Sequence, residues 1–355
     1  MDTKVLRQKV LDLAIRGKLV PQDPNDEPAS VLLERIRQQK QQMVKDGKLK
    51  AKDIKNDTII FVSEDNLHYE KFADGSVKCI EDEIPFELPD GWAWSRLGAV
   101  AEAIGDGDHQ PPPQTSFGVP FLVISNVSGG RLSFENTRFV SKEYFSQLPE
   151  TRKPRNGDLL FTVTGSYGIP VLIDSDDKFC FQRHIAIVRP CTISNRYLYV
   201  ILGSSYVKSI CDAKATGTAQ KTVGLATLRE LLIPVAPYKE QMQIYAQTQD
   251  ALSIVDSVSS DKEDLLNIIE SAKAKILDLA IRGQLVPQDP TDEPASVLLE
   301  RIRAEKEELI KQGKIKRDKK ESVIFRGEDN SYYEKMGGKV VWKCQEMCSR
   351  ETPKI

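Results

Sequence analysis

The sequence of 355 residues lacks the features that mark membrane, secreted and metal-dependent proteins. No apolar run approaches the ~18 to 20 residues that a membrane span requires. The first residues, MDTKVLRQKVLDLAIRGK, form an amphipathic pattern without the apolar segment of a signal peptide. The six cysteines include no CxxC pair and are accompanied by only three histidines. We therefore expect a cytoplasmic protein with buried thiols and no metal site.

Catalytic motifs are also missing. The chain contains no GxxxxGK[ST] phosphate loop, no GxGxxG after a strand, no HExxH and no GxSxG. It has no Asn-Pro-Pro or Asp-Pro-Pro step followed by an aromatic residue, the motif with which amino-methyltransferases hold a target amine. The net charge of -2 gives the chain as a whole no basic signature of a nucleic-acid binder. A non-catalytic role is predicted, and any DNA binding would depend on local groups of residues.

One segment occurs twice in the chain. LDLAIRGKLVPQDPNDEPASVLLERIR, residues 11–37, recurs from residue 277, where only Gln284 replaces Lys18 and Thr291 replaces Asn25. In each copy, apolar residues recur at helical spacing and a glycine follows the last turn, so each copy predicts a helical hairpin. The intervening sequence is not repetitive, unlike that of a solenoid. The duplicated hairpins are therefore expected to frame an inserted domain.

A long helix is predicted before the second copy. Residues 240–282 contain no Gly or Pro, and apolar residues recur there in alternating steps of four and three. This spacing predicts a coiled-coil seam along a helix that is roughly 60 Å long. The first helix of the first hairpin is too short to cover the whole seam. We therefore expect an antiparallel second copy of the chain to cover it and form a homodimer. The seam residues assigned to the dimer contact are Val255, Val258, Leu265, Ile269 and Ile276.

The sequence of the inserted domain predicts both helices and strands. Four short β-rich runs bounded by turn residues are predicted to form a compact sheet: 119–127, 157–165, 168–174 and 179–190. Residues 196–215 and 225–232 are predicted to be helices. The fold class is α/β, in the sense of a mixed α+β domain flanked by helical repeats that form a coiled-coil rod. The predicted divisions are a first helical repeat at 1–83, the inserted domain at 84–237, the long helix with the second repeat at 238–343, and an aberrant tail at 344–355.

Three loops of the inserted domain carry residues suited to contact a ligand. They combine glycines, which let backbone approach closely, with amide, hydroxyl and charged side chains that hydrogen-bond base edges or phosphates. Ordinary polar loops would have the same composition, and Arg183 with His184 in a nearby strand is interpreted as structural. The DNA-binding candidates are Asp108, His109 and Gln110 in GDGDHQPPPQTSFG (105–118), Ser166 and Tyr167 in TGSYG (164–168), and Gln220 and Lys221 in TGTAQKTVG (216–224).

Five segments in this order resemble the specificity subunit of type I restriction-modification systems. They are the repeated hairpin, LPDGWAWSRLGAVAE, GDLLFTVTGSYG, TGTAQKTVGLATLRELLIPVAPYKEQ and the long helix after it. The resemblance spans residues 1 to about 343. It implies a non-catalytic chain whose target-recognition domain reads one half of a split DNA sequence. It also implies modification subunits that dock on the helices and methylate adenine with S-adenosylmethionine, and restriction subunits that use ATP and Mg²⁺.

The sequence departs from this family in one respect. Full-length members carry two target-recognition domains, whereas here the second repeat runs through EDNSYYEKMGGKVVWKC into QEMCSRETPKI without a second domain. We interpret the chain as a half-length specificity subunit, arising as a natural truncation, a frameshifted gene copy or a shortened form. The alternative is a truncated, non-reading structural or regulatory subunit that only dimerises or sequesters modification subunits.

Overall fold

The computed structural model describes residues 2–218, 220–317, 322–336 and 339–343, with side chains as far as residue 340. Two compact units divide the chain, Met1–Asn267 and Ile268–Ile355. The first unit holds the first hairpin, the inserted domain and most of the long helix. The predicted tail at 344–355 lies outside the described residues.

The first hairpin forms as predicted, from α1 (Thr3–Ile15) and α2 (Ala29–Lys45). Gly17 has a φ of +63°, the left-handed conformation with which α1 ends. Pro28 stands directly before α2, where its fixed φ suits a helix start. Both helices bury their apolar face in the largest core of the unit, which includes Ile15 and Leu32.

A three-stranded antiparallel sheet follows the hairpin and was not predicted. It consists of β1 (Ile59–Val62), β2 (His68–Lys71) and β3 (Val77–Cys79) in the order β1-β2-β3. Asn66, with a φ of +61°, lies in the turn between β1 and β2. The strands are short and mostly exposed, so they lack the apolar run by which a buried strand is recognised. The first repeat is therefore not purely helical.

The inserted domain contains three small sheets as well as helices, in agreement with the predicted mixed α and β fold. The central one is antiparallel, in the order β5-β11-β8-β9. Every predicted β-rich run contains a strand, and the run 179–190 contains two. The strands of the central sheet are β5 (Ala101–Asp106), β8 (Leu159–Thr162), β9 (Pro170–Leu172) and β11 (Ile185–Pro190). The others are β6 (Val119–Leu122), β7 (Arg138–Val140) and β10 (Cys180–Phe181) in the order β10-β6-β7, and β4 (Ala93–Arg96) with β12 (Leu232–Val235).

Side chains on the two faces of the central sheet enter two different cores. Leu159 and Phe161 of β8 face the core shared with the first hairpin, whereas Leu160 between them faces a second core with Phe179 and Phe181. Successive residues of a strand point to opposite faces, so a sheet covered on both sides is apolar throughout. This explains the unbroken apolar run in β8.

One predicted helix is in fact two. Residues 196–215 divide into α5 (Asn195–Leu202) and α6 (Ser205–Lys214). Gly203 ends α5, and the hydroxyl of Ser204 accepts a hydrogen bond from the backbone N–H of Val207 at 3.3 Å. A serine with this capping contact starts a new helix, which the uninterrupted helical spacing concealed.

Shorter helices complete the first unit. The α-helices are α3 (Ala51–Ile54), α4 (Lys142–Gln147) and α7 (Leu225–Arg229). The 3₁₀ helices are η1 (Glu81–Glu83), η2 (Leu97–Val100), η3 (Ile124–Asn126) and η4 (Glu150–Arg152). Among the described residues, no helix combines the length and apolar character needed to span a membrane.

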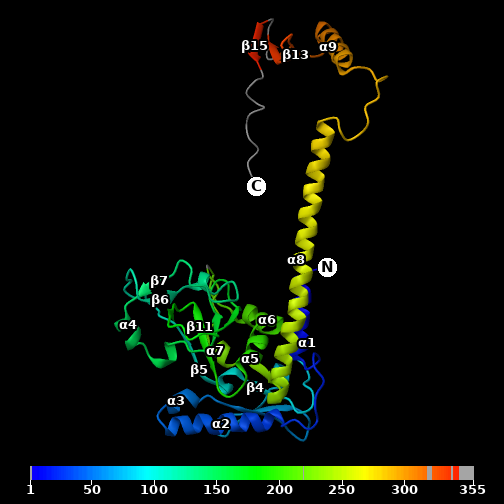
Figure 1. Cartoon of the computed structure of the whole chain (residues 1–355). Helices are drawn as coiled ribbons and strands as arrows, with labels where there is room; N and C mark the ends of the chain where they lie inside the picture. The colour runs from blue at the N-terminus through cyan, green and yellow to red at the C-terminus, as the bar shows by residue number, and fades with distance from the viewer. Residues whose placement is uncertain (1, 219, 318–321, 337–338, 344–355) are drawn as a thin grey trace. The chain divides into compact units, whose positions relative to one another are not determined.

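The long helix is continuous, as predicted, and forms α8 (Tyr238–Ile281). Helix α1 lies alongside its first half (Figure 1), where Arg7 pairs with Asp256 and Thr3 hydrogen-bonds to Ser259. Val255 is buried there, so the unit itself covers this part of the predicted seam. The four seam residues beyond it are exposed: Val258, Leu265, Ile269 and Ile276.

The second unit begins within α8 and repeats the secondary structure of the first repeat. It contains α9 (Ala295–Lys311) and an antiparallel sheet of β13 (Ser322–Arg326), β14 (Tyr332–Met336) and β15 (Lys339–Lys343). Phe325 stacks on Tyr333 as Phe61 stacks on Tyr69 in the first repeat. The duplication thus extends from the hairpin through the sheet.

The described cysteines follow the expected burial with one exception. Cys180, Cys191 and Cys211 are buried, whereas Cys79 is exposed on the edge strand β3. Burial is the leading cause that raises the pKa of Cys191 and Cys211 to about 11. Those two thiols are therefore protonated and unreactive near neutral pH.

Candidate DNA interface

Two of the three candidate loops leave the same end of the central sheet. Strand β5 ends at Asp106 opposite Ala186, and β8 ends at Thr162 opposite Ile185, both near the start of β11. Residues 107–118, which we call the proline loop, follow β5, and residues 164–168, the tyrosine loop, join β8 to β9. The antiparallel register therefore brings two segments far apart in sequence to one edge.

Residues 182–184, directly before β11, connect these two loops. The backbone N–H of Arg183 donates to the carbonyl of Asp108 at 3.1 Å, and that of Val163 donates to the carbonyl of His184 at 2.9 Å. Gln182 also forms a β-bridge with Asp108. The segment 182–184 thus stands between the proline loop and the tyrosine loop.

The third loop, residues 216–224 with residue 219 outside the description, joins the tyrosine loop directly. We call it the glutamine loop. Gly165 donates its backbone N–H to the carbonyl of Lys221 at 3.0 Å, and Val223 donates to the carbonyl of Val163 at 2.8 Å. A Cβ atom on Gly165 would lie 3.0 Å from Nε2 of Gln220. Gly165 therefore lets the Gln220 amide pack against the tyrosine loop.

In the proline loop, Asp108 is held within the fold. Its carboxylate lies 3.4 Å from Nη1 of Arg152. The pKa of the Tyr144 phenol is raised, first by burial and then by its hydrogen bond to Asp108. Because these groups engage the carboxylate, Asp108 organises the loop, and its contact with a base stays a prediction.

The residues of the proline loop that flank Asp108 differ in how closely they pack against the fold. Gly107 packs so closely that a Cβ atom there would lie 1.9 Å from the carbonyl oxygen of Phe181. His109 Nε2 lies 2.8 Å from Oδ2 of Asp106 while the ring itself stays largely exposed. Gln110 is exposed. Gly107 therefore anchors the loop and leaves Gln110 accessible to a ligand.

In the tyrosine loop, Tyr167 is also occupied. Its hydroxyl donates to Oδ1 of Asp212 on α6 at 2.8 Å, and Nζ of Lys208 lies 3.8 Å from the centre of its ring. The hydrogen bond to Asp212 is the leading cause that raises the pKa of Tyr167. Ser166 beside it is exposed. The ring fixes the loop to α6, and the exposed Ser166 is accessible to a ligand.

The sequence interpretation set Arg183 aside as structural, although the fold places it centrally. Its side chain is exposed and has no ion-pair partner within the described part of the chain. Burial, followed by the charge of Arg183, lowers the pKa of His184. Lys221 is likewise exposed without an ion-pair partner among the described residues. Two cations without ion-pair partners among the described residues therefore accompany the loops. The sequence indicated Lys221, whereas the position of Arg183 between β10 and β11 carried no sequence signal.

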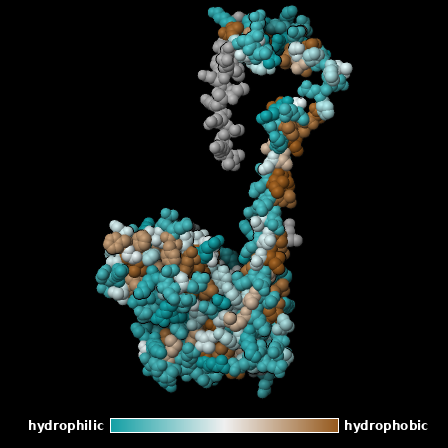
Figure 2. Space-filling model, viewed as in Figure 1, coloured by the Kyte–Doolittle hydropathy of each residue, from teal (hydrophilic) through white to brown (hydrophobic). Residues whose placement is uncertain are grey.

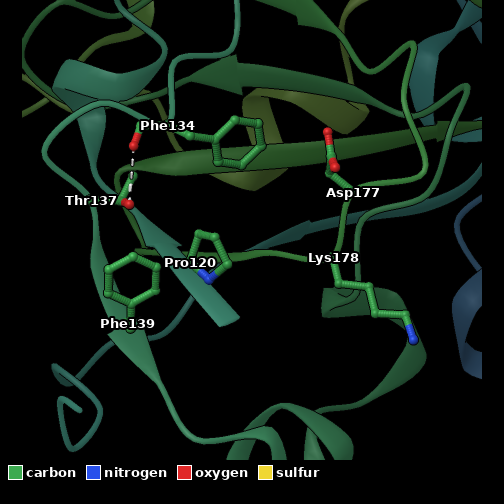
Figure 3. Close-up of a pocket in the computed structure, with 6 residues that line it drawn as sticks. All are labelled: Pro120, Phe134, Thr137, Phe139, Asp177 and Lys178. Atoms are coloured by element: carbon green, nitrogen blue, oxygen red, sulfur yellow. Dashed lines mark hydrogen bonds between the residues drawn. The ribbon is translucent and has the colours of Figure 1, made fainter. Parts of the chain in front are cut away.

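A shallow pocket lies elsewhere on the inserted domain (Figure 3). Pro120 and Phe139 come from the paired strands β6 and β7, and Phe134, Thr137, Asp177 and Lys178 complete the lining of a cavity of about 280 Å³. The hydroxyl of Thr137 donates to the carbonyl of Phe134 at 3.2 Å. None of these lining residues belongs to the three loops. Within the described residues, no group of three or more His, Cys, Asp or Glu side chains could hold a metal ion.

Comparison with known proteins places this chain in a family. Residues 89–267 match the model of the type I restriction modification DNA specificity domain. Relatives from Escherichia coli are the EcoAI specificity subunit, 32% identical over 89% of this chain, and the EcoEI specificity subunit, 30% identical over 89%. The chain spans 58% and 57% of their respective lengths.

Solved structures give weaker matches. A structure of a type I R-M system aligns over 57% of this chain and 48% of its own, with 23% identity and a TM-score of 0.46. The crystal structure of the HsdS subunit from Thermoanaerobacter tengcongensis aligns over 57% and 47%, with 26% identity and a TM-score of 0.40.

Proposed function

The chain belongs to the family of the type I restriction-modification DNA specificity domain, and from this membership we propose that it reads one half of a split DNA sequence. The reading surface is the loop end of the central sheet. The chain reads DNA as a specificity subunit and does not itself catalyse a reaction.

The observation that carries the proposal is the hydrogen-bonded junction of the proline loop, segment 182–184, the tyrosine loop and the glutamine loop. The exposed side chains of this junction match the chemistry of DNA. Amides pair in two points with adenine, an arginine pairs in two points with guanine, and a lysine contacts phosphate. We assign contact with DNA to Gln110, Ser166, Arg183, Gln220 and Lys221, and assign His109 to the edge of this surface. Asp108 and Tyr167 hold the loops in place.

Affinity is divided between this chain and partner subunits. Most of the affinity of proteins for DNA comes from phosphate neutralisation, which a chain of net charge -2 supplies only in part. Modification subunits docked on the helical repeats add the remaining cationic contacts. They also hold S-adenosylmethionine, and restriction subunits in the same complex hold ATP and Mg²⁺.

A homodimer supplies the second half-site. The exposed seam residues Val258, Leu265, Ile269 and Ile276 pair with those of an antiparallel second chain, and α8 then forms the coiled-coil rod. Figure 2 shows apolar residues at the surface along α8. Two identical reading surfaces related by a twofold axis recognise the same bases on opposite strands. The DNA site is thus an interrupted palindrome with several unread base pairs in its centre.

Mobility-shift selection from a random DNA library, with and without modification subunits, tests this function. The chain should enrich one gapped motif. Arg183→Ala should weaken binding and relax one position of the motif, while Lys78→Ala, which removes the same charge from the exposed strand β3, should leave the motif intact. No enriched motif under either condition would favour the non-reading structural role instead.

A further inference from the structure

The first hairpin is held by a defined surface of the first unit, which we call the hairpin-docking surface. It consists of Pro89, Gly91, Trp92, Lys239 and Glu240. The backbone N–H of Ala29 donates to the carbonyl of Gly91 at 2.8 Å, Nε2 of Gln22 donates to Oε1 of Glu240 at 3.2 Å, and Lys239 lies 3.2 Å from Oδ1 of Asp26. A Cβ atom on Gly17 would lie 2.4 Å from Cγ of Pro89 and 3.1 Å from the Trp92 ring.

The second hairpin, formed by the end of α8 and α9, repeats the internal geometry of the first. Gly283 has a φ of +65°, close to the +63° of Gly17. Its carbonyl accepts a hydrogen bond from the Gln288 side chain, as that of Gly17 does from Gln22. Arg282 pairs with Asp278 at 2.8 Å, as Arg16 pairs with Asp12 at 2.8 Å. The local sequence alone therefore builds the same hairpin twice.

Burial of the apolar face distinguishes the two hairpins. Ile15 is 0% exposed and Ile281 is 87% exposed. Val20 is 7% and Val286 69% exposed, and Ile36 is 1% and Ile302 49% exposed. Apolar surface left in water on this scale is unfavourable. The second hairpin thus presents an apolar face whose complementary surface is already known from the first.

We propose that the second hairpin of one molecule occupies the hairpin-docking surface of a second copy of this chain, in place of that copy's own first hairpin. The four first-hairpin residues named above have identical counterparts in the second hairpin: Gly17 in Gly283, Gln22 in Gln288, Asp26 in Asp292 and Ala29 in Ala295. The two hairpins therefore present the same contact residues to one surface. Exchange of identical elements between protomers is a recognised route to association.

The length of α8 requires two molecules. Glu240 lies in the first turn of α8 and Ile281 ends it, and a helix between these residues is about 60 Å long. A continuous helix of that length does not bring its own last turn onto its first. The first hairpin competes from within the same chain, where its effective concentration is high, so exchange increases with protein concentration and whenever the first hairpin is weakened. This association does not depend on DNA reading.

A matched pair of substitutions in the full chain tests the exchange. Ile15→Asp weakens the first hairpin at a position whose sequence surroundings are the same as those of Ile281. We expect Ile15→Asp to become more oligomeric by sedimentation, with a dissociation constant lowered more than about tenfold, and to melt at a temperature that rises with protein concentration. Adding Ile281→Asp should remove both effects. Ile281 lies off the seam of Leu265 and Ile269, so loss of the seam dimer does not imitate this result.

A milder variant keeps the test decisive if Ile15→Asp does not fold. Gln22→Ala removes the side-chain hydrogen bonds to Glu240 and to the Gly17 carbonyl, and leaves the apolar core of the hairpin intact. It should show the same shift toward oligomers, reversed by Gln288→Ala in the same chain. Association that is unchanged by Ile281→Asp and by Gln288→Ala in these backgrounds would overturn the exchange, while DNA selection by the same variants would report on the proposed function separately.

Discussion

Arg189 and Asp158 form a two-point ion pair inside the inserted domain. Nε of Arg189 donates to Oδ1 of Asp158 at 2.9 Å and Nη2 donates to Oδ2 at 2.8 Å, with both side chains under 10% exposed. Arg189 also donates to the carbonyl of Lys153 at 2.9 Å. The pair ties β11 to the turn before β8, and thereby secures the strands from which the reading loops leave.

Asp158→Ala is expected to lower the free energy of unfolding by about 3 to 5 kcal/mol, because Arg189 would remain buried without its counter-charge. Glu34→Ala is the control, since Glu34 pairs with Arg37 at the exposed surface of α2 and such pairs contribute below about 1 kcal/mol. Urea unfolding followed by circular dichroism measures both. Equal losses for the two variants would contradict the structural role of the buried pair.

The pH dependence of stability should report on Glu240. Burial is the main cause that raises the pKa of Glu240 above its ordinary value of 4.5. The folded state therefore keeps this proton more firmly than the unfolded state, and its contribution to stability is lost as the pH rises from 4.5 through the folded pKa. The melting temperature of Glu240→Gln minus that of the wild type should increase over this window.

Glu34→Gln provides a control of opposite sign for the same measurement. The hydrogen bond from Arg37 is the leading cause that lowers the pKa of Glu34. The stability that Glu34 contributes is present above pH 4.5 and is lost as the pH falls. The melting temperature of Glu34→Gln minus that of the wild type should therefore decrease as the pH rises. Parallel trends for the two variants in calorimetry would refute the assignment of Glu240.

Gln220→Ala combined with Lys221→Ala should weaken binding to the preferred DNA by ~1 to 3 kcal/mol and leave the melting profile intact. The slope of log affinity against log salt should fall by about 1, because one phosphate contact is lost. Ser76→Ala with Lys78→Ala, in the exposed turn and strand at β3, is the matched control. Unchanged affinity with an intact fold would remove the glutamine loop from the interface. Fluorescence anisotropy over a salt series gives both quantities.

Leu265→Asp with Ile269→Asp should abolish both the homodimer and the palindromic motif, because charges would replace apolar residues of the seam. Asn267→Asp with Ala274→Asp adds the same charge to the opposite side of α8 and should leave the dimer intact. Sedimentation velocity measures the dimer. Methylation-sensitive sequencing of DNA from cells making each variant with its modification subunit reads the motif, and an asymmetric or ungapped motif with the wild-type chain would argue against the dimer model.

The sequence by itself determined the elements whose signals are local. Glycine and proline placement with helical spacing predicted α1, α2 and the continuous α8. The β-rich runs predicted β6, β8, β9, β10 and β11, whereas β4, β5, β7 and β12 were not predicted. The sequence also indicated the three loops that the fold joins. These features follow from residues a few positions apart, which is the range over which caps, turns and periodicity act.

The tertiary structure decided which groups meet and which are free. Asp108 and Tyr167 look available in sequence, yet Arg152 and Asp212 engage them, whereas Arg183 becomes central only because β10 and β11 place it between two loops. The two hairpins make the same point most directly. Nearly identical sequences form the same local structure but differ completely in the burial of Ile15 and Ile281. Burial depends on the surface that long-range folding brings against a segment, and no local pattern encodes that surface.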